Sequence, residues 1–199
     1  MEIETGKPEQ ETKKESWWEL VRFALIAIVI VIPIRIYIAQ PFQVSGSSMV
    51  PTFEDKNYLI IDEISYEFGN PKRNDVVVFK YPNDTTKFFI KRVIGLPNET
   101  VDVKGNVVTI TNKEYPNGLI LDQSYVKNQS QTIDHFELKD DEYFVMGDNR
   151  SGSSDSRSWG AVPRNLLVGR ALLRLLPLSQ INIFPGQYDP FEKTEGHDE

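Results

Sequence analysis

Asp75-Val-Val-Val-Phe-Lys80 and Phe88-Phe-Ile-Lys-Arg-Val-Ile94 are the two stretches of this chain that decide its fold. Both are short and rich in β-branched and aromatic residues, and turn-forming residues such as Gly95 and Pro97 bound them. Runs of this length and composition are typical of β-strands rather than of helices. We therefore expect two strands here, and the flanking segments follow the same pattern.

A β-hairpin is expected directly after these strands. Residues 100–103 alternate apolar and polar side chains, and residues 107–111 form a second β-branched run. Lys104-Gly105-Asn106 supplies a turn between them. Pro and Gly recur at short intervals along the chain, which favours an all-β domain over a helical one.

The same pattern sets the extent of the domain. Residues 166–176 fit either a strand or a short helix, which Pro177 would end. Further strand-like runs occupy residues 58–62 and 142–146. The sequence therefore predicts a mainly β domain over residues 39–187, followed by a polar C-terminal tail at 188–199.

Residues 17–38 form an apolar segment before this domain. No charge occurs between Arg22 and Arg35, and aromatic residues flank the run as they do at membrane interfaces. With its flanks the segment reaches the roughly 20 residues that a membrane span needs, because arginines can extend to the headgroups. A buried core helix would have a polar face, and cleavage after Ala39 would put Tyr37 where a small residue is required. We therefore expect an uncleaved transmembrane anchor.

Basic residues decide the expected orientation of this anchor. Lysines and arginines gather on its N-terminal side, whereas none follows Arg35 until Lys56. By the positive-inside rule, residues 1–16 form a disordered cytoplasmic tail and everything after Pro41 lies outside the cytoplasm. If the apolar segment were a signal peptide, a cut after Gly46 would have a tolerable sequence around it, but Gly46 is far from the apolar run.

Composition excludes several classes of function. A net charge of −7 argues against nucleic acid as the main partner, because phosphate binding needs basic patches. The chain has no cysteine, so disulfides and thiolate zinc sites are excluded. His135 and His197 are its only histidines, too few for a His-rich metal site. A Ser-His-Asp triad would have to rest on His135 alone.

Three segments carry candidate chemistry, although each taken alone would pass for a polar loop or an edge strand. A serine hydroxyl is a weak nucleophile that needs a base, and without a usable histidine Lys91 is the obvious choice. Lys91 and Arg92 are adjacent, so they point to opposite faces of their strand. Apolar neighbours around Lys91 would lower its pKa, toward the roughly 7–8 that suits a catalytic lysine. The segments are Ser45-Gly-Ser-Ser-Met-Val-Pro-Thr52, Phe89-Ile-Lys-Arg-Val-Ile-Gly-Leu-Pro97 and residues 147–160.

In this order the three segments resemble the signature boxes of bacterial type I signal peptidases, also called leader peptidases. The resemblance covers most of residues 17–176 and includes Asn74-Asp-Val-Val-Val-Phe79 as a less specific box. It implies an all-β Ser-Lys peptidase domain of antiparallel sheets behind one N-terminal transmembrane helix, as in the smaller members of the family.

The resemblance also implies roles for individual residues. Ser48, directly before the Met of its box, matches the nucleophile, and Lys91 matches the general base. Ser153 matches the residue that hydrogen-bonds the catalytic lysine. One position departs from some members, which carry a serine where this chain has Gly46; the oxyanion would then depend on backbone amides, chiefly that of Ser48. The residues that match those bracing the site are Arg92, Asp148, Asp155 and Arg157, with Arg92 expected to pair with Asp148.

The function that the resemblance implies is removal of N-terminal signal peptides from secretory preproteins, after small residues of an Ala-x-Ala type. Its partners would be signal peptides and the lipid bilayer of a plasma or thylakoid membrane, with no metal or organic cofactor. Phe42, Val50 and Phe53 are expected to dip into the bilayer surface. Two alternatives stay open: a catalytically inactive, membrane-tethered peptide-binding homologue, and a self-cleaving Ser-Lys peptidase. Self-cleaving relatives are soluble and usually carry a DNA-binding segment, which the anchor and the acidic balance argue against.

Overall fold

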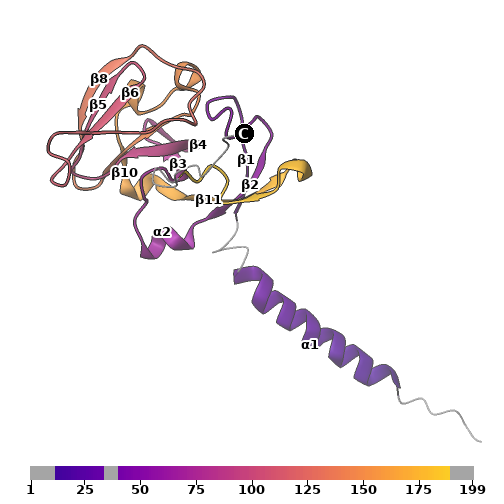
Figure 1. The fold of residues 1–199 in the computed structure, drawn as a ribbon. Helices are drawn as coiled ribbons and strands as arrows, with labels where there is room; N and C mark the ends of the chain where they lie inside the picture. Colours follow the sequence, from indigo (N-terminus) through magenta and orange to yellow (C-terminus); the bar gives the residue numbers. More distant parts are fainter. Residues whose placement is uncertain (1–11, 34–39, 189–199) are drawn as a thin grey trace, which may run out of the picture.

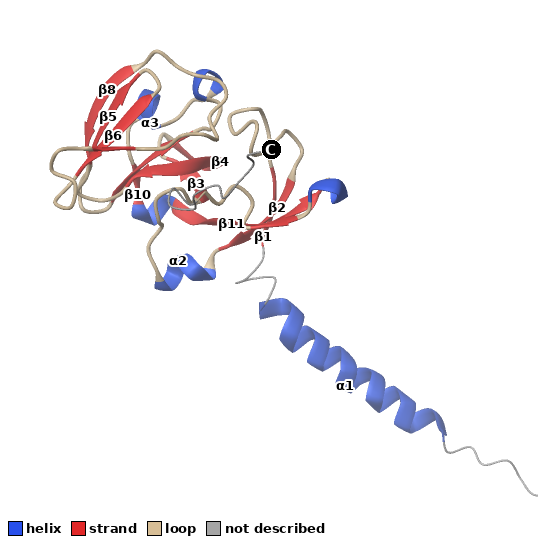
Figure 2. Ribbon diagram, viewed as in Figure 1, coloured by secondary structure: helices blue, strands red, loops and turns tan. Residues whose placement is uncertain are grey.

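The protein is described by a computed structural model that covers residues 12–33 and 40–188. A long helix, α1 (Thr12–Pro33), precedes a body built mainly of β-strands (Figures 1 and 2). The strands are β1 (Gln40–Gln43), β2 (Tyr58–Asp62), β3 (Val76–Tyr81), β4 (Asp84–Gly95), β5 (Thr100–Lys104), β6 (Val107–Thr111), β7 (Leu119–Ile120), β8 (Ile133–Glu137), β9 (Glu142–Met146), β10 (Val162–Pro163), β11 (Leu167–Leu176) and β12 (Asn182–Ile183). Short helical pieces are α2 (Ile64–Phe68), α3 (Ser156–Trp159) and 3-10 turns at Arg150–Gly152, Arg164–Leu166 and Leu178–Gln180. The prediction of a mainly β fold is confirmed.

Two antiparallel sheets make up the β body. The larger has eight strands in the order β1-β2-β11-β3-β4-β9-β10, with β12 paired to β11. The smaller has four strands in the order β7-β6-β5-β8. In Figure 1 the strands β5, β6 and β8 lie at one end of the β body, at a distance from α1. The expected antiparallel pairing is therefore confirmed.

Both faces of the larger sheet are covered, which explains the unbroken apolar run in β3. Val76 and Val78 pack into one buried cluster, while Val77 and Phe79 pack into another. Neighbouring residues of a strand point to opposite faces, so β3 contributes to two cores at once. The smaller sheet encloses a third cluster, in which its alternating valines and isoleucines pack against Phe144 and other residues of the larger sheet.

Most of the expected strands occur where the sequence predicts them. The hairpin of residues 100–111 forms as β5 and β6, with Lys104 opposite Val107. Residues 167–176 form the strand β11, which settles the choice between strand and helix. Strand β4 begins at Asp84 rather than at Phe88, because polar and largely exposed residues extend its pairing with β3.

The N-terminal helix carries much of the predicted anchor. Residues 34–38 of that anchor lie outside the described residues, as do 1–11 of the predicted tail and 189–199. The helix begins at Thr12, inside the segment expected to be a disordered tail. Over residues 12–33 and 40–188, no helix has both the length and the apolar content needed to cross a membrane. Exposed apolar side chains on α1 are Trp17, Trp18, Leu20, Phe23, Leu25, Ile26, Ile28 and Val29.

The expectation that Phe42, Val50 and Phe53 dip into a bilayer is wrong for Phe53. Its side chain is fully buried in the core beside β2, and Phe42 and Val50 are partly buried. Phe53 follows a polar loop in the sequence, but the loop folds back and its phenyl ring packs into the core. Exposed apolar side chains occur instead from the end of β11 to β12, at Leu176, Leu178, Ile181 and Ile183.

Candidate active site

Ser48 lies in the loop between β1 and β2, and buried apolar neighbours fix this loop. Met49 and Phe53 are almost completely buried in the cluster that also contains Leu59 of β2. The backbone amide of Phe53 donates a hydrogen bond to the carbonyl of Met49 over 2.9 Å. Ser48 directly precedes the first of these anchors, so its half-buried side chain is held beside the sheet.

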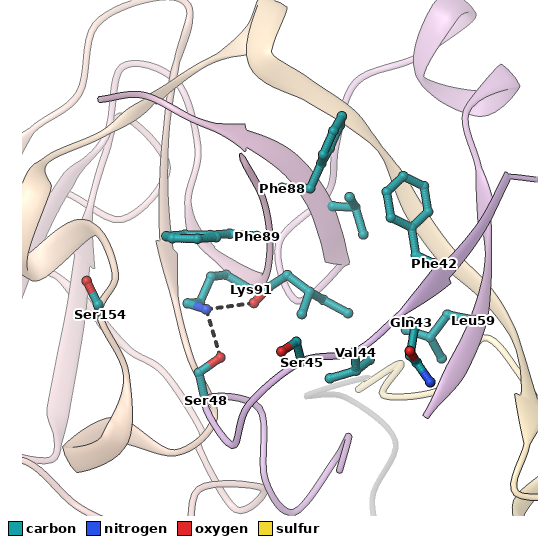
Figure 3. Close-up of a pocket in the computed structure, with 12 residues that line it drawn as sticks. Phe42, Gln43, Val44, Ser45, Ser48, Leu59, Phe88, Phe89, Lys91 and Ser154 are labelled. Atoms are coloured by element: carbon teal, nitrogen blue, oxygen red, sulfur yellow. Dashed lines mark hydrogen bonds between the residues drawn. The ribbon is translucent and has the colours of Figure 1, made fainter. Parts of the chain in front are cut away.

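Lys91 reaches Ser48 from the middle of the larger sheet. It lies on β4 opposite Val77 of β3, and its side chain is only 4% exposed. Its Nζ is 2.8 Å from Ser48 Oγ and donates to the carbonyl of Ile90 over 2.9 Å (Figure 3). The ring of Phe89 has its centroid 5.4 Å from the same nitrogen. The structure thus brings together the two residues that the sequence nominated as nucleophile and base.

The surroundings of Lys91 favour its neutral form. Burial lowers the pKa of Lys91 from 10.5 to about 8, against the negative charges of Asp155 and Asp148, which raise it. With that pKa, roughly one lysine in ten is neutral at pH 7. A neutral amine within hydrogen-bond reach of a hydroxyl can accept its proton.

A pocket of about 280 Å³ opens beside the Ser48–Lys91 pair. The close-up in Figure 3 has Ser48 and Lys91 beside one another, with the rings of Phe42 and Phe88 across the pocket. Those two rings have their centroids 5.5 Å apart. Its lining residues are Phe42, Gln43, Val44, Ser45, Ser48, Leu59, Val78, Phe88, Phe89, Ile90, Lys91 and Ser154. The pocket is therefore mainly apolar, and its polar side chains are Gln43, Ser45, Ser48, Lys91 and Ser154.

Arg92 points to the other face of β4, and there it forms the expected pair with Asp148. The guanidinium donates from Nε to Asp148 Oδ1 over 2.8 Å and from Nη2 to Oδ2 over 2.7 Å. Both side chains are almost fully buried. The hydroxyl of Thr52 also donates to Asp148 Oδ2, over 2.5 Å. The carboxylate thus joins β4 to the loop that carries Ser48.

Asp155 and Arg157 organise the segment that follows β9. Asp155 Oδ1 accepts from Arg157 Nε over 2.7 Å, and Oδ2 accepts from Arg157 Nη2 over 2.7 Å. The backbone amide of Gly147 donates to the same carboxylate over 2.9 Å. A side chain at Gly147 has no room, because its Cβ would lie 2.4 Å from the carbonyl oxygen of Ser48 and 2.3 Å from Ser153 Oγ. The segment therefore packs directly against the backbone of Ser48.

Ser153 does not make the hydrogen bond to Lys91 that the sequence predicts. The hydrogen bonds of Lys91 Nζ go to Ser48 and Ile90. Ser153 Oγ is buried and has no hydrogen-bond partner among the residues that the structure describes. The hydroxyl lies against Gly147 instead.

Thr52 and Asn149 are site residues to which sequence reasoning gave no role. The amide of Asn149 donates to the carbonyl of Ser48 over 3.0 Å, and its side-chain Nδ2 donates to the carbonyl of Ser47 over 3.1 Å. Both residues lie inside the candidate segments 45–52 and 147–160. Their polar side chains were the only feature of the sequence that could have suggested a role in the site. The amide of Ser48 itself has no acceptor among the described residues, which leaves it available for an oxyanion.

Comparison with known proteins identifies the family of the chain. The family model "Signal peptidase, peptidase S26" matches residues 17–176. The chain belongs to this family. A probable signal peptidase I-2 of Synechocystis is 38% identical over 188 residues, which cover 90% of this chain and 83% of the relative. Signal peptidase I of Leptolyngbya laminosa is 37% identical over 165 residues, or 78% of each chain.

A solved structure of a signal peptidase I from Enterococcus faecalis is also similar. It is 28% identical, and the match covers 51% of this chain and 96% of that one with a TM-score of 0.43. The sequence relatives and the family match confirm the prediction that the chain is an enzyme of the signal peptidase I class.

Proposed function

We propose that this chain is a serine endopeptidase in which Ser48 is the nucleophile and Lys91 its general base. The observation that carries the proposal is the 2.8 Å separation of Nζ and Oγ at a lysine that is 4% exposed. Its low pKa gives it a neutral fraction at physiological pH. The substrates are signal peptides of secretory preproteins, in keeping with the family.

In the first step Ser48 Oγ attacks the carbonyl carbon of the scissile peptide bond, and its proton passes to Lys91 Nζ. The oxyanion that forms takes a hydrogen bond from the amide of Ser48. The carbon–nitrogen bond then breaks, and Lys91 returns the proton to the leaving amine. An ester between Ser48 and the signal peptide remains.

In the second step Lys91 takes a proton from water, whose oxygen attacks the ester. The carbon–oxygen bond to Ser48 breaks, the hydroxyl regains its proton, and the signal peptide leaves with a free carboxylate. An ammonium has more donors than a neutral amine, and we assign Ser153 Oγ as an acceptor for Lys91 in this form. Its position in the segment against Ser48 and its unpaired hydroxyl support this role.

The pocket supports selection of small side chains. Its volume is about 280 Å³, and the rings of Phe42 and Phe88, which contact each other, form part of its wall. Apolar walls favour small apolar side chains over charged ones. The Ala-x-Ala type of site that the family resemblance implies fits these walls.

We further propose that residues 17–38 tether the enzyme to a lipid bilayer, with the β body on the extracytoplasmic side. The exposed apolar side chains of α1 and the basic residues before it support this placement. A carbonate wash of membranes containing the full chain tests it. The chain should stay in the pellet, and a chain lacking residues 1–38 should leave it.

The activity is tested by cleavage of a preprotein with the purified full chain in detergent. Ser48→Ala and Lys91→Met should each lower kcat roughly 10⁴-fold or more, because nucleophile and base act as a unit. Ser47→Ala and Lys87→Met are matched controls, since one neighbours the nucleophile and the other lies exposed on the same strand as the base.

Two results would contradict the proposal. Full activity of Lys91→Met would mean that another group takes the proton from Ser48. No cleavage of any preprotein by the unaltered chain would favour a peptide-binding protein without catalysis.

A further inference from the structure

Residues 184–188 follow β12 and reach the side of β4 on which Arg92 lies. The amide of Phe184 donates to the carbonyl of Leu172 on β11 over 2.7 Å, and Pro185 is buried. The carbonyl of Gly186 accepts a hydrogen bond from Arg92 Nη1 over 2.5 Å. Residues 184–188, called the strap below, therefore reach the buried arginine that pairs with Asp148.

Tyr125 holds the same guanidinium from another direction. Cζ of Arg92 lies 4.1 Å from the centroid of the Tyr125 ring, a favourable cation–π distance. Tyr125 contacts Tyr188 of the strap edge to face, with ring centroids 5.2 Å apart. The hydroxyl of Tyr188 donates to Asp122 and accepts from the hydroxyl of Ser124. The strap and the segment between β7 and β8 thus form one unit around Arg92.

This unit connects to the nucleophile through short hydrogen bonds. Arg92 holds both oxygens of Asp148, and Asp148 accepts from Thr52, four positions after Ser48. Asn149, which follows Asp148 in the chain, donates from its backbone amide to the carbonyl of Ser48. A displacement of Arg92 would therefore move the Ser48 loop at two points.

The strap also approaches the Ser48 loop closely at Gly186. Gly186 has φ +80°, a conformation that favours glycine. A Cβ there would lie 2.7 Å from Thr52 Cγ2 and 3.1 Å from Val76 Cγ2. No other residue fits this place without moving Thr52 or the strap.

We propose that the strap and Tyr125 position Ser48 against Lys91 by holding Arg92 on Asp148. Gly186, Tyr188 and Tyr125 are positioning residues, because none of them touches the reacting atoms. The inference rests on the proposed Ser48–Lys91 chemistry. It adds that residues near the C-terminal end of the β body determine the position of Ser48. Misplacement of a reacting group by about 1 Å can cost roughly 100-fold in rate.

The test compares Gly186→Ala with Gly118→Ala in the full-length enzyme in detergent. The two glycines are closely matched, because Gly118 has φ +86° and its Cβ would also lie 2.7 Å from a threonine Cγ2, that of Thr109. Gly118 directly precedes β7 of the smaller sheet. With a fluorogenic signal-peptide substrate, Gly186→Ala should lower kcat roughly 10- to 100-fold with KM unchanged, and Gly118→Ala should leave both unchanged. Thermal unfolding of both variants reports the strain that they share.

A second measurement does not depend on cleavage. Loosening Arg92 leaves the negative charge of Asp148 less neutralised, which raises the pKa of Lys91. Titration of the Lys91 ε-carbon by NMR should give a higher pKa in Gly186→Ala and in Tyr188→Leu than in the unaltered chain or in Gly118→Ala. Tyr188→Leu covers the case in which Gly186→Ala does not fold.

The outcomes separate the inference from the function on which it rests. Equal losses of kcat in the two glycine variants would refute the proposal that the strap positions Ser48. An unchanged Lys91 pKa in Gly186→Ala and Tyr188→Leu would refute it as well. Absence of cleavage by the unaltered chain overturns the proposed function alone, because the Lys91 titration still decides whether the strap acts on the site.

Discussion

Replacing Lys91 by methionine should make the folded protein more stable at neutral pH while it abolishes activity. Burial lowers the pKa of Lys91 from 10.5 to about 8. At about 1.36 kcal/mol for each pH unit, this difference corresponds to about 3 kcal/mol of the free energy of unfolding. Methionine is similar in length and has no charge to bury. The variant also loses the hydrogen bonds of Lys91 to Ser48 and Ile90. Each lost bond reduces this gain in stability by about 1 kcal/mol.

The sign of the pH dependence follows from the direction of this shift. The folded state holds the proton of Lys91 less tightly than the unfolded chain does, so protonated Lys91 destabilises the fold. The penalty is complete below pH 8 and fades as the pH rises toward 10.5. We therefore expect Lys91→Met to be more stable than the unaltered chain by about 1 kcal/mol or more at pH 7. At pH 10 the penalty has fallen to about 1 kcal/mol, and the advantage should disappear or reverse.

Urea unfolding of the full chain in detergent micelles measures this effect, with circular dichroism of the β body as the signal. The difference between variant and unaltered chain at each pH cancels every other titrating group. Lys87→Met is the matched control, because Lys87 lies on the same strand with its side chain 64% exposed. Because the hydrogen bond with Asp84 raises the pKa of Lys87, any pH dependence of Lys87→Met should be opposite in sign to that of Lys91→Met.

Two results would refute the reasoning. A Lys91→Met variant that is less stable than the unaltered chain at pH 7 would mean that Lys91 stabilises the fold and is not penalised by burial. A stability difference that stays constant from pH 7 to pH 10 would mean that the pKa of Lys91 is close to that of an exposed lysine.

Four further outcomes are expected. The kcat/KM of the unaltered enzyme should rise about tenfold per pH unit below pH 8 and level off above it, since only neutral Lys91 accepts a proton; a profile already flat at pH 6 would contradict this. Gly147→Ala should lower kcat roughly 100-fold with the fold intact by circular dichroism, because its Cβ would lie 2.4 Å from the Ser48 carbonyl oxygen. Ile183→Asp at the exposed β11–β12 connection should weaken binding of a chain lacking residues 1–38 to anionic lipid vesicles, whereas Ile120→Asp on the smaller sheet should not. Chelating agents should leave the rate of cleavage unchanged, and a loss restored by a metal would contradict the Ser-Lys assignment.

The strands that the sequence predicts correctly are those whose side-chain pattern reflects burial. Residues 100–111 alternate because one face of the hairpin packs inward, and β3 is continuously apolar because both its faces are covered. Strand β8 was missed because it alternates between exposed and partly buried residues, with His135 and charged neighbours giving little apolar signal. Strand β1 was missed because residues 40–43 contain Pro and two Gln.

The candidate site divides in the same physical way. Ser48 and Lys91 are 43 positions apart, yet each stands in a motif with a recognisable composition, so the sequence nominates both. The roles of Tyr125 and Gly186 could not be predicted, because their contacts with Arg92 depend on how distant segments pack. The orientation of the Ser153 hydroxyl is likewise set by packing against Gly147 rather than by its neighbours in the chain.

The adjacency of Lys91 and Arg92 explains how the pKa of Lys91 stays low beside two carboxylates. Asp148 and Asp155 both act to raise the pKa of Lys91, which works against its function as a base. Each carboxylate is engaged by an arginine through two hydrogen bonds, Asp148 by Arg92 and Asp155 by Arg157. Because these pairs are largely neutralised, the desolvation of Lys91 remains the dominant influence on its pKa. Asp148 and Asp155 can therefore hold the Ser48 loop and the segment after β9 without restoring the pKa of Lys91 to its ordinary value.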